Sequence, residues 1–220
     1  MKPYYQDESV TLYHGDCREV VEWLSADVFV TDPPYGIGWS RGVNKARASK
    51  SHDGIANDHD TSARDEAIAM AADKPWIIFG SFYAPFPNGL TQLLVWHKPN
   101  DAGVVGSVTG YRRDVEPIFL IGDWPQRNAQ WSSVVRSSLR GIAAITTATG
   151  HPHTKPTDLV CLLMERCPDG VIADPFAGSG TTLVAAKNRG RKAIGVEIDE
   201  AYCERAAERL RQGSLTEMFQ

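Results

Sequence analysis

The chain has 220 residues, of which 42% are hydrophobic and 23% are charged, and its formal net charge is −4. This composition is typical of an ordinary globular protein and allows one domain with a sizeable core. It excludes a collagen, a coiled coil and a wholly disordered chain, and no apolar run approaches the ~20 residues of a membrane span. The negative charge argues against a protein that coats nucleic acid non-specifically. It leaves open a nucleic-acid enzyme, for which the local charge distribution matters more.

The cysteines and the N-terminus bear on location and metal binding. The four cysteines, Cys17, Cys161, Cys167 and Cys203, are far apart and form neither a C-x-x-C pair nor a cluster with zinc spacing. We therefore expect buried free thiols and no metal site. The first ten residues are polar and acidic rather than secretory in pattern, so we expect a cytoplasmic protein with no membrane contact.

Hydrophobic periodicity predicts strands that alternate with helices along most of the chain. In the first part we predict strand 10–13, helix 17–24, strand 26–31, helix 61–73 and strands 76–79, 90–96 and 115–121. In the second part we predict helix 157–167, strand 171–173, helix 180–187, strand 193–196 and helix 200–211. Two polar segments, 36–60 and 122–150, have no clear period and are interpreted as long functional loops. This alternation predicts an α/β protein with a mostly parallel sheet and ligands at the carboxyl ends of its strands.

A glycine-rich turn joins the strand at 171–173 to the helix at 180–187. It consists of Asp174, Pro175, Phe176, Ala177, Gly178, Ser179, Gly180, Thr181 and Thr182. Such glycines let the backbone approach a ligand, and the helix N-terminus offers free N–H groups. The turn lacks the third glycine of a dinucleotide fingerprint and the lysine of a P-loop, so by itself it is also compatible with a tight structural turn.

Glu197 strengthens the ligand interpretation of that turn. It ends the next predicted strand, where an acid can accept hydrogen bonds from both hydroxyls of a ribose. The pair predicts an adenosine-type cofactor site without a polyphosphate requirement, and the alternative is a surface acid after a strand. Asp199 is predicted to cap the following helix.

The segment Asp32-Pro33-Pro34-Tyr35 ends another predicted strand. The two prolines stiffen the turn and hold the Asp32 carboxylate, the Pro33 carbonyl and the Tyr35 ring in one small arc. A planar heteroaromatic amine suits this arrangement, because its two N–H groups can donate to the carboxylate and the carbonyl while the ring stacks. The alternative is a proline-rich strand terminator with an incidental aspartate.

Together these motifs resemble those of the DNA amino-methyltransferases, the N-4 cytosine/N-6 adenine methylases that use S-adenosylmethionine. The Asp32–Tyr35 segment matches the family's catalytic motif, 174–182 its cofactor motif, and Gly195–Asp199 its ribose-binding strand end. The segment His151–Pro156 is similar to a further family segment, which implies that Lys155 and Pro156 help to bind the cofactor. The catalytic motif precedes the cofactor motif, as in the permuted β group.

The resemblance implies a doubly wound, Rossmann-like, seven-stranded fold, circularly permuted, whose last strand is antiparallel. Segments 170–174, 192–197, 10–14 and 27–31 would be its first four strands, and the strands at 76–79, 90–96 and 115–121 the other three. Asp16 would then end the third strand, where the family commonly contacts the cofactor's adenine, or cap a helix that starts at Cys17. Residues 1–220 would form a single domain, with a target-recognition insertion at 99–150.

The implied activity is methylation of the exocyclic amino group of an adenine flipped out of double-stranded DNA. Asp32, Pro33, Pro34 and Tyr35 would be catalytic: Asp32 stabilises the developing positive charge and Tyr35 stacks on the base. Adenine is preferred because the family's cytosine enzymes more often carry Ser at the first position of this motif. The alternatives are a cytosine N4 or RNA methyltransferase, a glutamine methyltransferase, whose family usually has Asn first, or a non-catalytic DNA-binding protein on the same fold.

Basic residues are in excess in two middle segments of the chain, 36–60 and 97–156. Between 97 and 156, Lys and Arg outnumber Asp and Glu by 7 to 4. We predict that Arg41, Lys45, Arg47 and Lys50 contact phosphates from a lid formed by residues 39–60. Base reading and further phosphate contacts are predicted for Arg112, Arg113, Arg127, Arg136 and Arg140. A homodimer, a partner restriction nuclease and the recognition sequence are left open.

Overall fold

The computed structural model describes residues 1–38, 56–98, 110–125, 128, 130–137 and 155–212. Most of the predicted lid and target-recognition insertion, including Arg41, Lys45, Arg47, Lys50, Arg127 and Arg140, lies outside the described residues.

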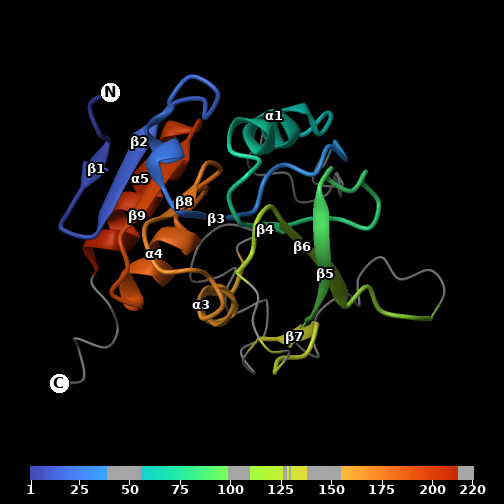
Figure 1. The fold of residues 1–220 in the computed structure, drawn as a ribbon. Helices are drawn as coiled ribbons and strands as arrows, with labels where there is room; N and C mark the ends of the chain where they lie inside the picture. Colours follow the sequence, from blue (N-terminus) through green and yellow to red (C-terminus); the bar gives the residue numbers. More distant parts are fainter. Residues whose placement is uncertain (39–55, 99–109, 126–127, 129, 138–154, 213–220) are drawn as a thin grey trace.

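The strands of the described residues form one mixed sheet (Figure 1). They are β1 (Tyr5–Gln6), β2 (Val10–His14), β3 (Val28–Thr31), β4 (Trp76–Phe79), β5 (Leu90–His97), β6 (Val115–Ile121), β7 (Val134–Arg136), β8 (Ile172–Asp174) and β9 (Ala193–Glu197). Their spatial order is β1-β2-β9-β8-β3-β4-β6-β5-β7. Strands β2, β9, β8, β3 and β4 are parallel to their neighbours in this run, whereas β6 is antiparallel to both β4 and β5.

The expected seven-stranded sheet is confirmed as the run from β2 to β5, with its antiparallel strand and its permuted chain order. Two short strands extend it, β1 at one edge and β7 at the other. Neither strand was predicted, because two or three residues are too few to show an alternating pattern. β7 gives part of the predicted irregular segment 122–150 a regular structure.

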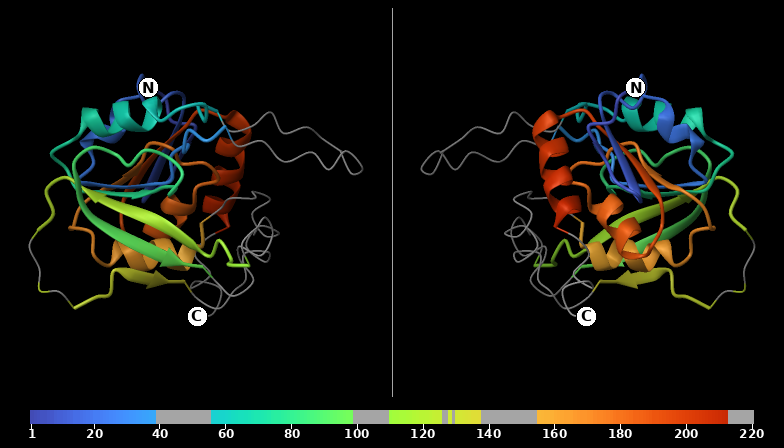
Figure 2. Two further views of the ribbon diagram at one scale, coloured as in Figure 1. Left: turned by 90° about the vertical axis from the view of Figure 1, so that its right-hand side faces the viewer. Right: turned by 90° about the vertical axis from the view of Figure 1, so that its left-hand side faces the viewer.

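Helices cover the sheet on both faces (Figures 1 and 2). They are α1 (Ser62–Met70), α3 (Thr157–Met164), α4 (Thr181–Asn188) and α5 (Glu200–Arg211), and a 3₁₀ helix, η1, spans Glu22–Ser25. One core cluster packs α3, α4 and α5 on Val28 and Val30 of β3, and the other packs η1 and α1 on Phe29. All four residues of β3 are buried, as expected for a central strand rich in β-branched side chains.

The predicted helix at 17–24 is wrong. The chain instead makes a turn at Asp16, whose backbone oxygen accepts from the N–H groups of Glu19 and Val20, and then forms η1. The buried Trp23 donates its indole N–H to the Cys17 carbonyl at 2.8 Å, while Val21 is 49% exposed. Tertiary packing of Trp23 therefore overrides the helical spacing of the valines.

The remaining local predictions agree with the structure apart from helix ends. α1 and α3 each end three residues before the predicted bound. Asp199 caps α5, accepting from the Ala201 N–H at 2.8 Å. All four cysteines are free, and three are buried while Cys161 is partly buried. None of the helices in the described ranges has the length and apolar character that a membrane span requires.

Gly122 provides a test of how closely β6 and β4 approach at their ends. It follows β6 with φ of +78°, and an added Cβ would lie 1.9 Å from the Lys74 backbone oxygen. Gly122→Ala should lower the free energy of unfolding by about 2–5 kcal/mol, combining left-handed strain with a backbone clash. Gly190→Ala is the matched control, because Gly190 has φ of +65° but an added Cβ would meet nothing within 4 Å. Equal urea midpoints for the two variants would contradict the packing argument.

Candidate functional site

The candidate site is a cavity of about 490 Å³ at the carboxyl ends of the parallel strands. The residues that directly follow β2, β3, β4, β8 and β9 line it together, although the first and last of them, Gly15 and Ile198, are 183 positions apart in sequence. The two halves of the doubly wound sheet meet where β8 pairs with β3, and the cavity lies at this junction. This is the switch point at which open α/β sheets bind ligands, and the volume suits a small organic ligand.

The predicted glycine-rich turn forms one wall of the cavity, and the carboxylate of its first residue, Asp174, has a structural role. Asp174 is 3% exposed and accepts from the Thr31 hydroxyl at 2.7 Å and the Phe176 N–H at 3.0 Å. Burial raises the pKa of Asp174 to about 6, although the hydrogen bonds from Thr31 and Thr182 oppose the shift. The carboxylate therefore ties the end of β8 to β3 and shapes the turn.

The two glycines of the turn serve different purposes. Gly178 lines the cavity with φ of +51°, and an added Cβ would meet nothing within 4 Å. Gly180 caps α4 with φ of +79°, and there an added Cβ would lie 2.9 Å from that of Ala206 on α5. Gly180, like the predicted cofactor residue Pro156, is not among the cavity-lining residues. Gly180 thus permits close helix packing, while Gly178 permits access to a ligand.

Glu197 at the end of β9 lies beside this turn, as predicted. Its side chain accepts from the Gly178 N–H at 2.7 Å and from the Asp199 N–H at 2.8 Å, and the residue is 8% exposed. Burial raises the pKa of Glu197 to about 7. A carboxylate has about four acceptor positions, so two remain for the cavity, which fits the two hydroxyls of a ribose.

Arg209 on α5 supports the turn from outside the cavity and was not singled out in the sequence. Its guanidinium donates to the Ser179 backbone oxygen at 2.6 Å and contacts the hydroxyls of Ser179 and Thr181 at 3.2 Å. Burial lowers the pKa of Arg209. No local pattern in the predicted helix marks this arginine, because its partners are about 30 residues away.

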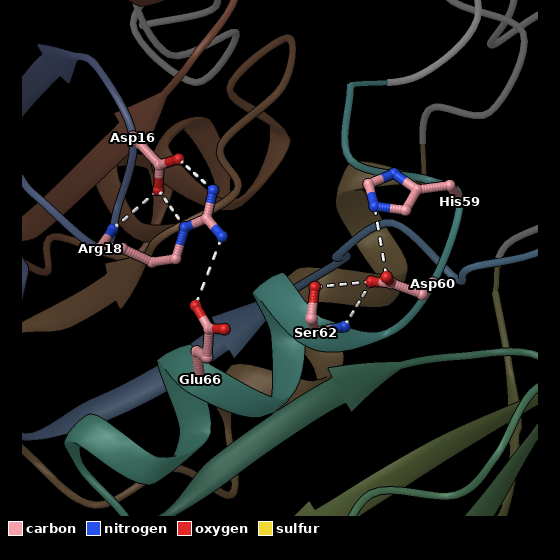
Figure 3. A network of polar contacts seen from close by, with 6 residues as sticks. All are labelled: Asp16, Arg18, His59, Asp60, Ser62 and Glu66. Atoms are coloured by element: carbon pink, nitrogen blue, oxygen red, sulfur yellow. Dashed lines mark hydrogen bonds and ion pairs between the residues drawn. The ribbon is translucent and has the colours of Figure 1, made fainter.

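Asp16, predicted to contact an adenine or to cap a helix, is held by Arg18 (Figure 3). Its Oδ1 accepts from the Arg18 backbone and Nε at 2.9 Å, and Oδ2 accepts from Nη2 at 2.5 Å. Hydrogen bonds from Arg18 lower the pKa of Asp16. Arg18 also reaches Glu66 on α1 at 3.3 Å, and nearby Asp60 accepts from Ser62 at the start of that helix. Asp16 lines the cavity, but the helix-cap role fails because no helix begins at Cys17 and the N-cap of η1 is Val21.

The catalytic-motif candidates lie on the β3 side of the cavity, and all four of them line it. The Tyr35 hydroxyl donates to Asp32 Oδ1 at 2.7 Å, and the ammonium of Lys155 contacts Asp32 Oδ2 and the Tyr35 oxygen, both at 2.9 Å. Burial and the Asp32 carboxylate raise the pKa of Tyr35 well above its ordinary value. Lys155 was expected beside the cofactor; in the structure its ammonium lies on the carboxylate of Asp32, the catalytic candidate.

Glu116 completes this cluster and was missed by the sequence analysis. Its Oε1 lies 3.6 Å from the Lys155 ammonium and 3.3 Å from the Tyr35 hydroxyl, and Oε2 lies 3.2 Å from the ammonium of Lys98. Burial alone would raise the pKa of Glu116, but Lys155 and Lys98 hold it below its ordinary value. Likewise, burial alone would lower the pKa of Lys155, but Asp32 and Glu116 raise it. Glu116 reaches this edge because antiparallel β6 begins where the parallel strands end.

The predicted DNA-contacting arginines of the described residues also gather at this edge. Arg112 and Arg113 precede β6, and Arg136 ends β7, which runs parallel to β5 and with it ends at the same edge as β4. Arg113 lines the cavity and lies 5.4 Å from the centre of the Tyr83 ring. Arg112 pairs with Asp114 at 3.1 Å, and Arg136 contacts His97 at 3.4 Å.

Comparison with known proteins gives a consistent match. Residues 122–208 match the N6/N4 methyltransferase family model, described as "DNA methylase". The chain is 25% identical over 272 aligned residues to the type II methyltransferase M.ScaI of Streptomyces caespitosus, covering 95% of this chain and 84% of that protein. It is 27% identical over 257 residues to the type II methyltransferase M2.LlaDCHI of Lactococcus lactis subsp. cremoris, covering 97% and 93%.

Solved structures share the fold. The complex of M1.HpyAVI with SAM superposes with a TM-score of 0.62 at 21% identity, covering 91% of this chain and 99% of that one. The PvuII DNA methyltransferase, described as cytosine-N4-specific, has a TM-score of 0.62 at 18% identity, covering 94% and 88%.

The buried Glu197 carboxylate should make stability depend on pH. Its pKa of about 7 exceeds the ordinary value of 4.5, so the folded state holds this proton more tightly than the unfolded chain. The stabilisation of the folded state that comes from this raised pKa is therefore fully present below pH 4.5 and is lost as pH rises through 7. Glu197→Gln removes this loss, so the stability of the variant relative to wild type should rise by about 3 kcal/mol from pH 4 to pH 8.

Urea unfolding at several pH values measures this difference, and Glu200→Gln, an exposed change in the first turn of α5, is the matched control. A difference between Glu197→Gln and wild type that stays constant with pH would contradict the role of burial.

Proposed function

We propose that this chain, which belongs to the N6/N4 DNA methylase family, methylates the exocyclic amino group of adenine in double-stranded DNA. That it is an S-adenosylmethionine-dependent DNA methyltransferase is the common property of the family; adenine as the target and the roles of individual residues are our proposal. One observation carries it: a single cavity joins a carboxylate suited to an amino group, Asp32, to a carboxylate suited to a ribose, Glu197.

The wall formed by the glycine-rich turn and Glu197 would hold the cofactor. When bound there, S-adenosylmethionine supplies a methyl group activated by a positively charged sulfur. Glu197 would accept from its ribose hydroxyls, and Gly178 leaves room for close approach of the ligand. Asp16, whose position Arg18 fixes, would face the adenine. The buried acid and the open backbone of this wall therefore fit the cofactor that the family uses.

Asp32 and Pro33 would activate the target nitrogen. The lone pair of an exocyclic amine is delocalised into the ring, so the nitrogen is a poor nucleophile. When its two N–H groups donate to the Asp32 carboxylate and the Pro33 carbonyl, a pyramidal nitrogen with a localised lone pair is favoured. The Asp32 carboxylate then stabilises positive charge that develops on the nitrogen, in a site where Asp32 is already oriented by Tyr35.

The target amino group lies inside the base stack of a duplex, so the base must be flipped into the cavity at a cost of a few kcal/mol. Stacking on the Tyr35 ring would recover part of this cost, about 1–3 kcal/mol. Residues 99–150 would read the sequence, since the described part of this segment brings Arg112, Arg113 and Arg136 to the cavity edge of the sheet. The other predicted contacts, in the 39–60 lid and at Arg127 and Arg140, remain predictions.

Two alternative functions would be distinguished by the methylation experiment described below. A cytosine N4 methyltransferase would use the same acceptor groups on a different base, and the PvuII enzyme with that description shares the fold. A non-catalytic DNA-binding protein would have no need of the partly buried cluster of Asp32, Tyr35 and Lys155, which argues for catalysis.

The central test is methylation of plasmid DNA with labelled S-adenosylmethionine, followed by digestion to nucleosides. We expect N6-methyl-2′-deoxyadenosine from the wild type and no detectable product from Asp32→Ala, because the variant lacks the acceptor for the amino group. Calorimetry should show cofactor affinity within severalfold of wild type. Asp73→Ala, an exposed acid outside the cavity lining, is the control.

Each contrary result has a separate meaning. Labelled N4-methyl-2′-deoxycytidine would overturn the choice of base, and the absence of any labelled nucleoside would overturn the activity. A tenth or more of wild-type turnover in Asp32→Ala would remove Asp32 from the catalytic role.

Arg113 and Arg112 form a matched pair for DNA contact. Arg113 lines the cavity, whereas the charge of its neighbour is balanced by Asp114. Arg113→Ala should weaken DNA binding and reduce the salt dependence of log K by about one unit if the contact is to phosphate. If the contact is to a base, specificity should relax at one position of the site. Arg112→Ala should have the smaller effect, and wild-type binding and methylation by Arg113→Ala would exclude the contact.

A further inference from the structure

We infer that Glu116 is a positioning residue that frees the Asp32 carboxylate for its substrate by taking over the Lys155 ammonium. The inference deepens the proposed function and rests on it. It concerns a step before methyl transfer: how an aspartate that is already occupied becomes available to an incoming amino group.

Both oxygens of Asp32 have partners in the structure. Oδ1 accepts from the Tyr35 hydroxyl, and Oδ2 contacts the Lys155 ammonium at 2.9 Å. An ammonium binds a carboxylate more strongly than a neutral amine does, because its hydrogen bond is charge-assisted. Lys155 therefore competes with the substrate for the same oxygen, and its positive charge opposes the charge that develops on the target nitrogen.

Lys155 can leave Asp32 only if another anion receives it. The side chain of Lys155 is 8% exposed, so its charge cannot be transferred to water without cost. Glu116 Oε1 lies 3.6 Å from the same ammonium, compared with 2.9 Å for Asp32 Oδ2. Because the ammonium sits on a flexible stem between the two carboxylates, a small movement exchanges one partner for the other.

The charges around the cluster favour this exchange. The two carboxylates, Asp32 and Glu116, are balanced by the two ammonium groups of Lys155 and Lys98, and Lys98 lies 3.2 Å from the other oxygen of Glu116. The Tyr35 hydroxyl lies 2.7 Å from Asp32 and 3.3 Å from Glu116, so it bridges both carboxylates. After the exchange both ammonium groups lie beside Glu116, and Asp32 keeps the hydrogen bond from the Tyr35 hydroxyl and gains those of the incoming amino group.

Glu116→Gln tests the inference, because the amide keeps the size of the side chain and cannot balance the ammonium. Lys155 should then bind Asp32 alone, so KM for DNA should rise at least tenfold and kcat should fall. The cofactor dissociation constant should stay within twofold of wild type. Glu116→Asp, which keeps the charge, should recover most of the activity.

A double-mutant cycle with Lys155→Met separates this role from a merely structural one. Once the ammonium is absent, Glu116→Gln should change kcat/KM by less than twofold, whereas a structural role predicts the same loss in both backgrounds. If Lys155→Met has no measurable turnover, the dissociation constant for DNA is read in the same four proteins, with the same expectation. Melting temperatures identify any variant that fails to fold.

Failure of the proposed function and failure of the role of Glu116 give different results. Wild-type protein that transfers no methyl group to DNA would overturn the proposed function. An active wild type with equal effects of Glu116→Gln in both backgrounds, or an unchanged KM for DNA in Glu116→Gln, would overturn the inference alone.

Discussion

The site depends on the shared direction of five strands, β2, β9, β8, β3 and β4. Their carboxyl ends lie along one edge of the sheet, so residues from distant parts of the chain, such as Asp16, Asp32 and Glu197, line the same cavity. The antiparallel strand β6 brings Glu116 to the same edge, because its first residues lie where the parallel strands end. Asp32 comes from the end of a strand and Glu116 from the beginning of one, and only strands of opposite direction could bring both to this edge.

Burial of charge distinguishes the two walls of the cavity. In the wall formed by the glycine-rich turn and Glu197, neutral donors, namely backbone N–H groups and hydroxyls, surround Asp174 and Glu197, and burial raises the pKa of both carboxyl groups. In the wall formed after β3 and at the start of β6, Asp32 and Glu116 face ammonium groups, and the pKa of Glu116 is lowered in spite of burial. The first wall fits the proposed ribose site, and the matched charges of the second allow partners to be exchanged at constant net charge.

Arginine and lysine side chains fix groups that sequence motifs alone leave free. Arg18 holds Asp16, Arg209 holds the turn at Ser179, and Lys155 holds Asp32. In each case the cation comes from outside the motif that it supports. Substitution of one of these three cations would therefore disturb the site even though the sequence of the group that the cation holds is unchanged.

Much of the fold could be predicted from the sequence, because its signals are local. The buried strand at Val28–Thr31 shows as a β-branched run, and the proline pair after Asp32 marks its end. The glycine-rich turn and Glu197 lie at consecutive strand ends, so their meeting in one cavity follows from parallel pairing alone. The seven-stranded order and the antiparallel strand followed from the family resemblance that these motifs carry.

Tertiary structure decided what local pattern could not encode. A turn and a 3₁₀ helix stand in place of the helix predicted at 17–24, because the buried indole of Trp23 donates its N–H to the Cys17 carbonyl. Glu116 is an ordinary acid in a strand until the pairing of β6 with β4 brings it beside Lys155, and Lys155 lies 123 residues from the aspartate that it contacts. The sequence by itself determined which groups stand at the strand ends and the chemistry they can perform. Which cation neutralises which carboxylate was decided only by the folded chain, because such pairing depends on distances that sequence spacing does not contain.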